Sequence, residues 1–368
     1  MKILYGVVGE GMGHATRSSV IVNHLASQGH EILIVVSGRA YKFLHDRFNY
    51  LPNVEIREIE GFSLSYEDNK LSLPKTIWKN VRAVPKQLTK NIGLYLELHK
   101  RHYEPDVVIS DFDSWAHAFA MTHRVPFMSI SNIQALSHLK HRNKIFKKTD
   151  IHYQVTRFFT KMKNPFADYY LIPSFFNSGV RHKNTIVTPL IVRDEILNAE
   201  RKKGDHVVVY KTGSNEFNLK KYLQNFPMQF IIYGMNEEGE EENIIMRKFS
   251  GDEFVKDLSS AKAVIANAGF SLMSECIHLG IPMLALPIQR QFEQEMNARY
   301  LCNKGFGDWT YKLRAKDIER FFGTLNFYES RLQKYKRQDN QKTLKLVDRL
   351  IRELYRKGRY INAGGKKS

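Results

Sequence analysis

Residues 2–37 read KILYGVVGEGMGHATRSSVIVNHLASQGHEILIVVS, and this stretch decides the fold. An apolar, β-branched run over 2–8 is broken by the glycines of 9–13. Apolar residues then recur at helical spacing over 18–27, and a second apolar run follows over 31–37. Buried strands that alternate with a helix in this way are typical of a parallel sheet. The sequence therefore predicts a strand–helix–strand unit at the N-terminus.

The same alternation continues along the chain in two series. The first series adds predicted strands at 106–110, 126–131 and 169–172. The second series follows residue 189, with a predicted helix at 271–279 and predicted strands at 206–211, 229–233, 263–266 and 283–286. We expect an α/β protein with two Rossmann-like domains, 1–188 and 189–339. Over 340–355 one apolar side at helical spacing predicts an amphipathic helix, docked on the protein and followed by a basic tail to 368.

The net charge of +18 is concentrated in two segments. Residues 136–163 carry eight Lys or Arg against one acid, and residues 331–368 carry thirteen against three. Solvated surface is the simpler interpretation. Aromatic residues among the cations of 136–163 favour an anionic membrane surface instead, and no specific nucleic acid is expected.

Cysteine content and hydropathy bear on location. Two cysteines are too few for a disulfide framework, so a reducing compartment is expected. The apolar runs are too short to cross a bilayer, and the first residues lack the pattern of an export signal. We expect a cytoplasmic protein, either free or peripheral at the inner face of the cell membrane.

A strand, a glycine turn and a helix follow one another in ANAGFSLMSECIHLGIP, residues 266–282. Unpaired N–H groups at such a helix start favour a phosphate group, which Gly269 lets approach closely and Ser271 can contact. Glu275 lies one turn further on, where a carboxylate can accept both hydroxyls of a ribose. Helix caps of this composition are common, so an ordinary cap is the alternative.

Carboxamides follow the next predicted strand, which ends at residue 286. Gln289, Gln291, Glu293, Gln294 and Asn297 come within twelve residues of it. Ligands collect at the carboxyl ends of strands in open α/β sheets. Paired donors and acceptors of this kind suit the hydroxyls of a sugar ring.

Three stretches carry a family resemblance: GFSLMSE at 269–275, GIP at 280–282 and PIQRQFEQEMNA at 287–298. They resemble the nucleotide-sugar signature of the MurG-like and UDP-glucuronosyltransferase-like GT-B glycosyltransferases. GEGMGHATRS at 9–18 resembles the first glycine-rich loop of the same group, especially its branch of predicted glycosyltransferases and teichoic acid biosynthesis proteins. The resemblance covers roughly residues 1–310. It implies a GT-B fold, with two Rossmann-like domains facing across a cleft, and a UDP-sugar donor.

The resemblance also assigns roles. It implies that Glu275 holds the ribose and that the base pocket lies near 249–254. A second phosphate loop is expected at 212–214, although it is less glycine-rich here than in the family. The donor-binding residues implied are Thr212, Gly213, Ser214, Gly269, Phe270, Ser271, Glu275, Gln289, Glu293 and Gln294.

His14 is the candidate catalytic base, because an imidazole at the opening of the first helix can take the proton of an acceptor hydroxyl. Asp111 ends a predicted strand and can orient His14 or act as the base itself. Gly11, Gly13 and Arg17 belong to the same phosphate or acceptor loop.

Metal and cofactor are not expected. Asp111-Phe112-Asp113 has the Asp-Xaa-Asp form that binds a metal in another glycosyltransferase fold. Three-residue matches arise by chance, however, and a helix N-terminus already favours the diphosphate. No His and Cys cluster with zinc spacing occurs.

These features predict an inverting hexosyltransferase that moves a sugar from a nucleotide-diphosphate donor to a hydroxyl group, with a lipid-linked or cell-envelope glycan as acceptor. Three alternatives remain open. A non-hydrolysing UDP-sugar epimerase shares the architecture, a nucleic-acid-binding or base-glucosylating protein would account for the charge, and a binding module could have lost catalysis.

Overall fold

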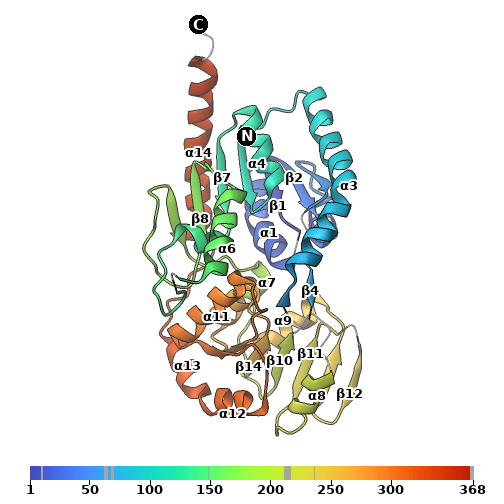
Figure 1. The fold of residues 1–368 in the computed structure, drawn as a ribbon, viewed down its shortest axis with the longest axis vertical. Coiled ribbons are helices and arrows are strands. Elements are labelled where there is room, and N and C mark those ends of the chain that lie inside the picture. The colour runs from blue at the N-terminus through green and yellow to red at the C-terminus, as the bar shows by residue number, and fades with distance from the viewer. Residues whose placement is uncertain are drawn as a thin grey trace.

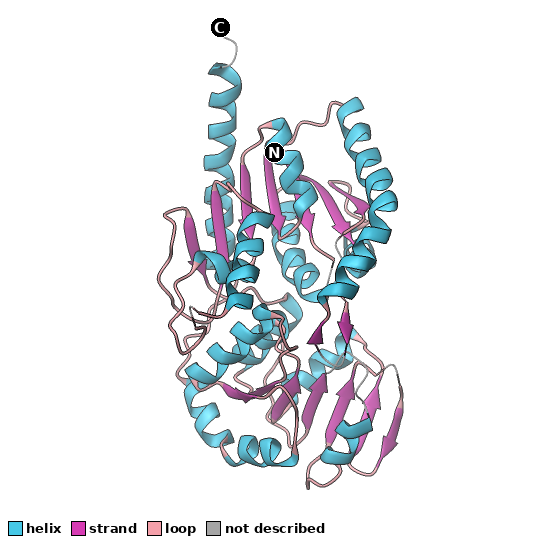
Figure 2. Ribbon diagram, viewed as in Figure 1, coloured by secondary structure: helices cyan, strands magenta, loops and turns pink. Residues whose placement is uncertain are grey.

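The computed structural model describes residues 1–9, 11–61, 65–67, 70–147, 149–210, 217–235 and 237–364. Two seven-stranded sheets lie one above the other in Figure 1, each with helices on both faces (Figures 1 and 2). The predicted α/β class with two Rossmann-like domains is therefore confirmed. Among the described residues, no helix is both long and apolar enough to span a membrane.

The N-terminal sheet has the strand order β3-β2-β1-β6-β7-β8-β9, and every neighbouring pair is parallel. Its central strands are almost entirely apolar, as expected where helices cover both faces, whereas the edge strand β3 carries charged residues. A two-stranded ribbon, β4 (Tyr66–Glu67) and β5 (Lys70–Leu71), stands apart from it. The seven strands are β1 (Lys2–Val7), β2 (Glu31–Ser37), β3 (Val54–Ile59), β6 (Val107–Asp111), β7 (Phe127–Ile130), β8 (Tyr169–Pro173) and β9 (Thr185–Thr188).

Alternate residues of these strands pack against two sets of helices. Ile3 and Tyr5 of β1 face α1 (Met12–Ser27) and α2 (Arg39–Phe48). Leu4 faces the opposite side, with α3 (Leu73–Lys100) and α4 (Ser114–His123). After β7 come η1 (Asn132–Gln134), α5 (Ala135–His138) and α6 (Ile151–Lys163).

The C-terminal sheet has the order β12-β13-β11-β10-β14-β15-β16, parallel except for the β12–β13 pair. Its strands are β10 (Val207–Tyr210), β11 (Phe230–Tyr233), β12 (Gly239–Glu241), β13 (Ile244–Arg247), β14 (Ala263–Ala266), β15 (Met283–Ala285) and β16 (Gly307–Trp309). The helices of this half are α7 (Asp194–Leu197), α8 (Phe217–Leu223), α9 (Gly251–Ser260), α10 (Phe270–Leu279), α11 (Phe292–Lys304), α12 (Ala315–Gly323) and α13 (Leu325–Gln333).

The last helix, α14 (Gln341–Gly364), returns to the N-terminal sheet (Figure 1). Leu350, Ile351 and Leu354 pack beside α1 in the core on that face. His24 Nε2 and Asp348 Oδ1 lie 2.9 Å apart, and the Tyr169 hydroxyl donates to Glu353 at 3.0 Å. The apolar stripe of α14 is thus docked on the protein, on the domain that begins the chain.

A continuous apolar core joins the two halves. Phe146 and Tyr153 of the N-terminal half belong to the same buried cluster as Phe270 and Phe292 of the C-terminal half. The rings of Phe176 and Tyr300 stack with centroids 3.6 Å apart. The two sheets are therefore held in a defined arrangement by buried aromatic contacts.

Candidate active site

The carboxyl ends of the central strands define where a ligand fits. In the N-terminal sheet the chain proceeds in one direction from β1 to β2 and in the other from β6 to β7, so the order reverses between β1 and β6. The same reversal occurs between β10 and β14 in the second sheet. Ligands bind outside the strands at such switch points in open α/β sheets. His14 follows β1, Asp111 ends β6, and Gly269 follows β14.

His14 and Asp111 lie in direct contact. Asp111 Oδ1 is 2.8 Å from His14 Nδ1, across the β1–β6 pair in which Val7 lies beside Asp111. A carboxylate only accepts, so the tautomer of His14 that bonds it carries the proton on Nδ1 and an electron pair on Nε2; Arg17 Nη2 also lies 3.1 Å from Nδ1. The Asp111 side chain is 1% exposed, whereas that of His14 is 15% exposed. The arrangement can therefore present Nε2 of His14, whose ring is held by Asp111 through Nδ1, to a molecule on the more exposed side of the pair.

Arg17 neutralises the buried carboxylate. Its Nη2 is 2.7 Å from Asp111 Oδ2, its Nε donates to the same oxygen at 3.1 Å, and Ser18 Oγ donates there at 3.1 Å. Burial alone would raise the pKa of Asp111, but the Arg17 charge and the His14 contact outweigh it and the pKa lies below its usual value. Asp111 therefore stays ionised beside His14.

Asn132 links this cluster to the other domain. Arg17 Nη1 donates to Asn132 Oδ1 at 3.0 Å, and Asn132 Nδ2 donates to Glu293 Oε1 at 3.0 Å. Asn132 is 2% exposed, so both hydrogen bonds are shielded from water. The sequence prediction missed Asn132, although its place after the strand ending at residue 130 was a usable signal.

The N-termini of α1 and α10 meet between the two domains. Ser271 Oγ donates to the Gly13 carbonyl at 2.9 Å, and a Cβ added at Gly13 would lie 2.9 Å from that hydroxyl. The N-caps Gly11 and Gly269 make no side-chain hydrogen bond to their helices. Amide groups of both helix starts therefore remain for an anion, including those of Phe270 and Ser271.

Glu275 lies behind this junction on α10. Both carboxylate oxygens accept from Arg193, from Nε at 2.8 Å and from Nη2 at 3.1 Å. Burial raises the pKa of Glu275 above its usual value although Arg193 opposes the shift. Arg193 is 82 residues away in sequence, so no local pattern could have indicated this partner.

The carboxamide segment forms a shaped loop. Gln294 Oε1 accepts from the Ile288 amide at 3.0 Å, and Glu295 Oε1 accepts from the Arg290 amide at 3.0 Å. Arg290 has φ 68°, in the left-handed region, where a non-glycine residue needs such support. Gln289 lines a hollow of about 340 Å³ beside Tyr311. The loop therefore places Glu293 against Asn132 of the other domain and Gln289 at the hollow beside Tyr311.

Two further regions were expected to contact the donor: the second phosphate loop at 212–214 and the base pocket near 249–254. Thr212, Gly213 and Ser214 lie outside the described residues. Near 249–254, the half-exposed ring of Phe249 lies 6.1 Å from Tyr210 and 5.3 Å from Phe254, centroid to centroid. An exposed ring supported by buried rings can stack on a planar base.

The carboxylates of Asp111-Phe112-Asp113 are already engaged. Asp113 Oδ1 accepts from the Ala116 amide at 2.8 Å and so caps α4, while Asp111 faces Arg17. In the part of the chain that the structure describes, no three His, Cys, Asp or Glu residues gather as a metal site.

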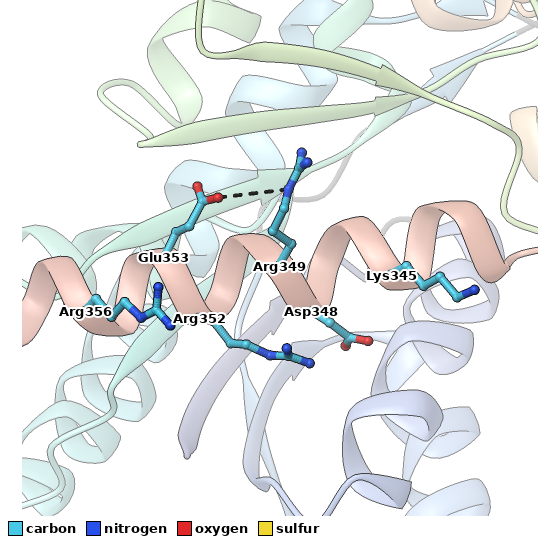
Figure 3. A pocket seen from close by; sticks show the side chains of 6 residues that line it. All are labelled: Lys345, Asp348, Arg349, Arg352, Glu353 and Arg356. Atoms are coloured by element: carbon cyan, nitrogen blue, oxygen red, sulfur yellow. Dashed lines mark ion pairs between the residues drawn. The ribbon is translucent and has the colours of Figure 1, made fainter.

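A basic hollow on α14 lies outside this site. It has a volume of about 400 Å³ and is lined by charged side chains of that helix alone, including Arg349 and Glu353, whose charged atoms are 3.9 Å apart (Figure 3). No expected donor-binding or catalytic residue lines it.

The known proteins that this chain resembles in sequence are glycosyltransferases. The model of the family described as glycosyl transferase family 1 matches residues 1–326. An uncharacterized glycosyltransferase of Methanosarcina mazei is 27% identical over 342 residues, 83% of this chain and 85% of that protein. One of Methanosarcina acetivorans is 26% identical over 336 residues, with the same coverage.

Solved structures share the fold. LpCGTa in complex with UDP has a TM-score of 0.68 at 14% identity, covering 96% of this chain and 99% of that one. A UDP-glucosyltransferase from Polygonum tinctorium has a TM-score of 0.68 at 13% identity, covering 96% and 98%. The glycosyltransferase of kitacinnamycin has a TM-score of 0.65 at 15% identity, covering 95% and 98%. The expected GT-B architecture is confirmed, and the chain belongs to glycosyl transferase family 1.

Proposed function

We propose that this glycosyltransferase moves a hexose from a UDP-sugar to an acceptor hydroxyl, with inversion at the anomeric carbon and with His14 as the general base. The observation that supports this most is the 2.8 Å contact between His14 Nδ1 and the buried Asp111 carboxylate. It leaves Nε2 as the proton acceptor on the more exposed side of the pair.

The proposed step is a single displacement. The acceptor O–H gives its proton to His14 Nε2 as its oxygen forms a bond to the anomeric carbon. The bond from that carbon to the diphosphate oxygen breaks, and UDP leaves with the electron pair. Asp111 stabilises the imidazolium, because Arg17 keeps the pKa of its carboxyl group low.

The donor is proposed to lie along α10 and the loop before α11. Amides of Phe270 and Ser271 would bind the diphosphate, which Gly269 lets approach closely, although the Gly269 amide itself donates to the Asn267 carbonyl at 2.8 Å. We propose that no metal ion takes part, because a helix N-terminus stabilises the leaving charge. Glu275 would accept the ribose hydroxyls. Glu293 and Gln294 would hold the hexose, and Gln289 its outer edge. The UDP bound to LpCGTa supports this choice of nucleotide, since that protein has the same fold.

We propose a lipid-linked or cell-envelope glycan acceptor, used at the inner face of the membrane, as in the MurG-like branch. The supporting observation is the excess of cations over 136–163 and 331–368, of which 136–163 lies in the domain that carries His14. Membership of the MurG-like or teichoic acid branch stays a prediction.

A thermal-shift panel of UDP, GDP, TDP and CDP species and their sugars tests the donor site. A ligand of the native state raises the melting temperature by mass action. We expect uridine species to raise it for the wild type and for the surface control Glu55→Ala, and Glu275→Ala to remove the shift. If no nucleotide raises the melting temperature, the donor site is wrong. An isomerised sugar formed without acceptor would indicate an epimerase.

A further inference from the structure

Helix α3 exposes an unusual stripe of large apolar side chains. Six of them recur at spacings of three and four along the helix, and each is between 41% and 63% exposed. They are Trp78, Val81, Val84, Leu88, Ile92 and Leu96. The opposite side of the helix is buried through Asn80, Leu94 and Leu98. The stripe is therefore additional to the face that anchors α3 to the sheet.

Cations follow the flank of this stripe. Residues 73–100 include six Lys or Arg and a single acid, Glu97. At 3.6 residues per turn, Lys75, Lys79, Arg82 and Lys100 fall together on the side next to the stripe, whereas Lys90 turns toward the sheet and pairs with Glu58 and Glu60. The Arg82 guanidinium lies 3.6 Å from the Trp78 ring centroid. Core face, cationic flank and apolar stripe thus occupy three separate sectors of one helix.

Helix α6 adds a second apolar stripe. Five residues on it are 47% to 76% exposed: Ile151, Val155, Phe158, Phe159 and Met162. The end of α6 meets α4, because Asn164 Nδ2 donates to the Asp113 carbonyl at 2.9 Å. Helix α4 in turn meets α3, because Trp115 Nε1 donates to the Asn91 carbonyl at 3.0 Å. Helices α3, α4 and α6 therefore lie on the same side of the sheet, with α3 along its outer edge (Figure 1).

We propose that the exposed residues of α3 and α6, named here the α3–α6 surface, dock this domain on an anionic lipid bilayer. Amphipathic helices with a basic flank and Trp, Phe and Leu on the apolar side lie in the interface of such membranes. Both helices would lie in the headgroup region, since no described helix can span a membrane.

The basic segment at the end of the chain does not share this surface. Helix α14 packs on the other face of the sheet, with α1, and buries its apolar residues there. Its outward side carries Lys345, Arg349, Arg352 and Arg356 (Figure 3). A flat bilayer that contacts α3 and α6 is therefore separated from α14 by the sheet. Of the two basic segments, 136–163 and 331–368, the first includes α6 and forms part of the α3–α6 surface.

This inference rests on the proposed function in one respect: an acceptor held in the membrane is the reason why the protein would bind a bilayer. Vesicle binding and donor binding are separate measurements on the same protein. Loss of one with retention of the other shows which proposal fails.

The test is co-sedimentation of the full chain with vesicles of phosphatidylcholine, with or without about 30% phosphatidylglycerol. The variant is Leu88→Gln with Ile92→Gln. The matched control is Phe327→Gln on α13, because Phe327 and Leu88 are each 53% exposed. Melting temperatures and the UDP-induced shift are recorded for all three proteins, to show that folding and donor binding are retained.

We expect the wild type and Phe327→Gln to sediment with the anionic vesicles and to remain in solution with phosphatidylcholine alone. The partition coefficient of the double variant into the anionic vesicles should be roughly tenfold lower than that of the wild type. Equal binding of the double variant and the wild type would overturn the proposal, as would no binding of the wild type. A dimer that the double variant disrupts, without vesicle binding, would assign the surface to a protein contact instead.

Discussion

At the scale of single residues, the cleft is organised by buried charges that neutralise one another. Asp111 faces Arg17, and Glu275 faces Arg193. The strand pattern could predict that His14 and Asp111 lie near each other, because His14 follows β1 and Asp111 ends the neighbouring strand β6, whereas the roles of His14, Asp111 and Glu275 stay predictions. It could not predict the arginine opposite Glu275, because their pairing depends on how the chain passes from one domain to the other.

The Arg193–Glu275 pair gives a pH-dependent prediction. Arg193→Ala leaves a carboxylate that is 6% exposed without its cation, which should lower the free energy of unfolding by about 3–5 kcal/mol near pH 8. A carboxyl group whose pKa is raised in the folded state favours folding at low pH and opposes it as pH rises. Without Arg193 the pKa of Glu275 should rise further, so the loss should shrink toward about pH 5.

Urea unfolding at both pH values measures this effect. The control is Arg47→Ala, since the Arg47–Glu195 pair is about one third exposed and its loss should cost less than about 1 kcal/mol at either pH. Equal, small losses in the two variants, independent of pH, would contradict the account of a buried, ionised Glu275.

At the scale of helices and strands, hydrophobic pattern predicted the central elements. Strands β1, β2, β6, β7, β8, β10, β11, β14 and β15 all overlap predicted runs, because they are buried on both faces and almost wholly apolar. Five other strands of the two sheets were missed: β3 and β9 at the edges of the first sheet, β12 and β16 at the edges of the second, and β13 beside β12. Edge strands carry charges and glycines, as in β3 (VEIREI) and β12 (GEE), which weaken the apolar signal.

The hydrophobic pattern of a helix does not show which part of the protein the helix packs against. The apolar stripe of 340–355 predicted a docked helix, but its spacing is the same whichever domain it contacts. In the structure α14 returns to the first domain and ties the two ends of the chain together. The long helix α3 was not predicted, since two apolar sectors and one basic sector leave no clean amphipathic pattern.

Helix α14 should contribute to the stability of the N-terminal domain. Ile351 is 1% exposed in the core shared with α1, so Ile351→Ala should lower the free energy of unfolding by about 2–5 kcal/mol. Arg349 lies two residues before Ile351, on the exposed side of the helix. Arg349→Ala should change the free energy of unfolding by less than about 0.5 kcal/mol. Denaturant unfolding of both variants measures the difference. Similar values for the two would mean that α14 is not part of this core.

At the scale of the whole molecule, the helices that follow the switch points of the two sheets meet between the domains. Ser271 and Gly13 are in hydrogen-bond contact there, and Asn132 joins Arg17 to Glu293. A diphosphate that reaches both helix starts has to displace the contact between Ser271 and Gly13. We therefore expect donor binding and the relative position of the domains to be coupled.

We infer that one set of residues binds the donor and another, His14 with Asp111, accepts the proton. The most direct test is the rate at which His14→Ala releases UDP from a saturating UDP-sugar by hydrolysis, with water in place of the acceptor hydroxyl, compared with the wild type. We expect this rate to fall about 10²–10⁴-fold, because the attacking water has lost its base, while UDP raises the melting temperature as before. UDP release by His14→Ala at the wild-type rate would show that His14 is not the base.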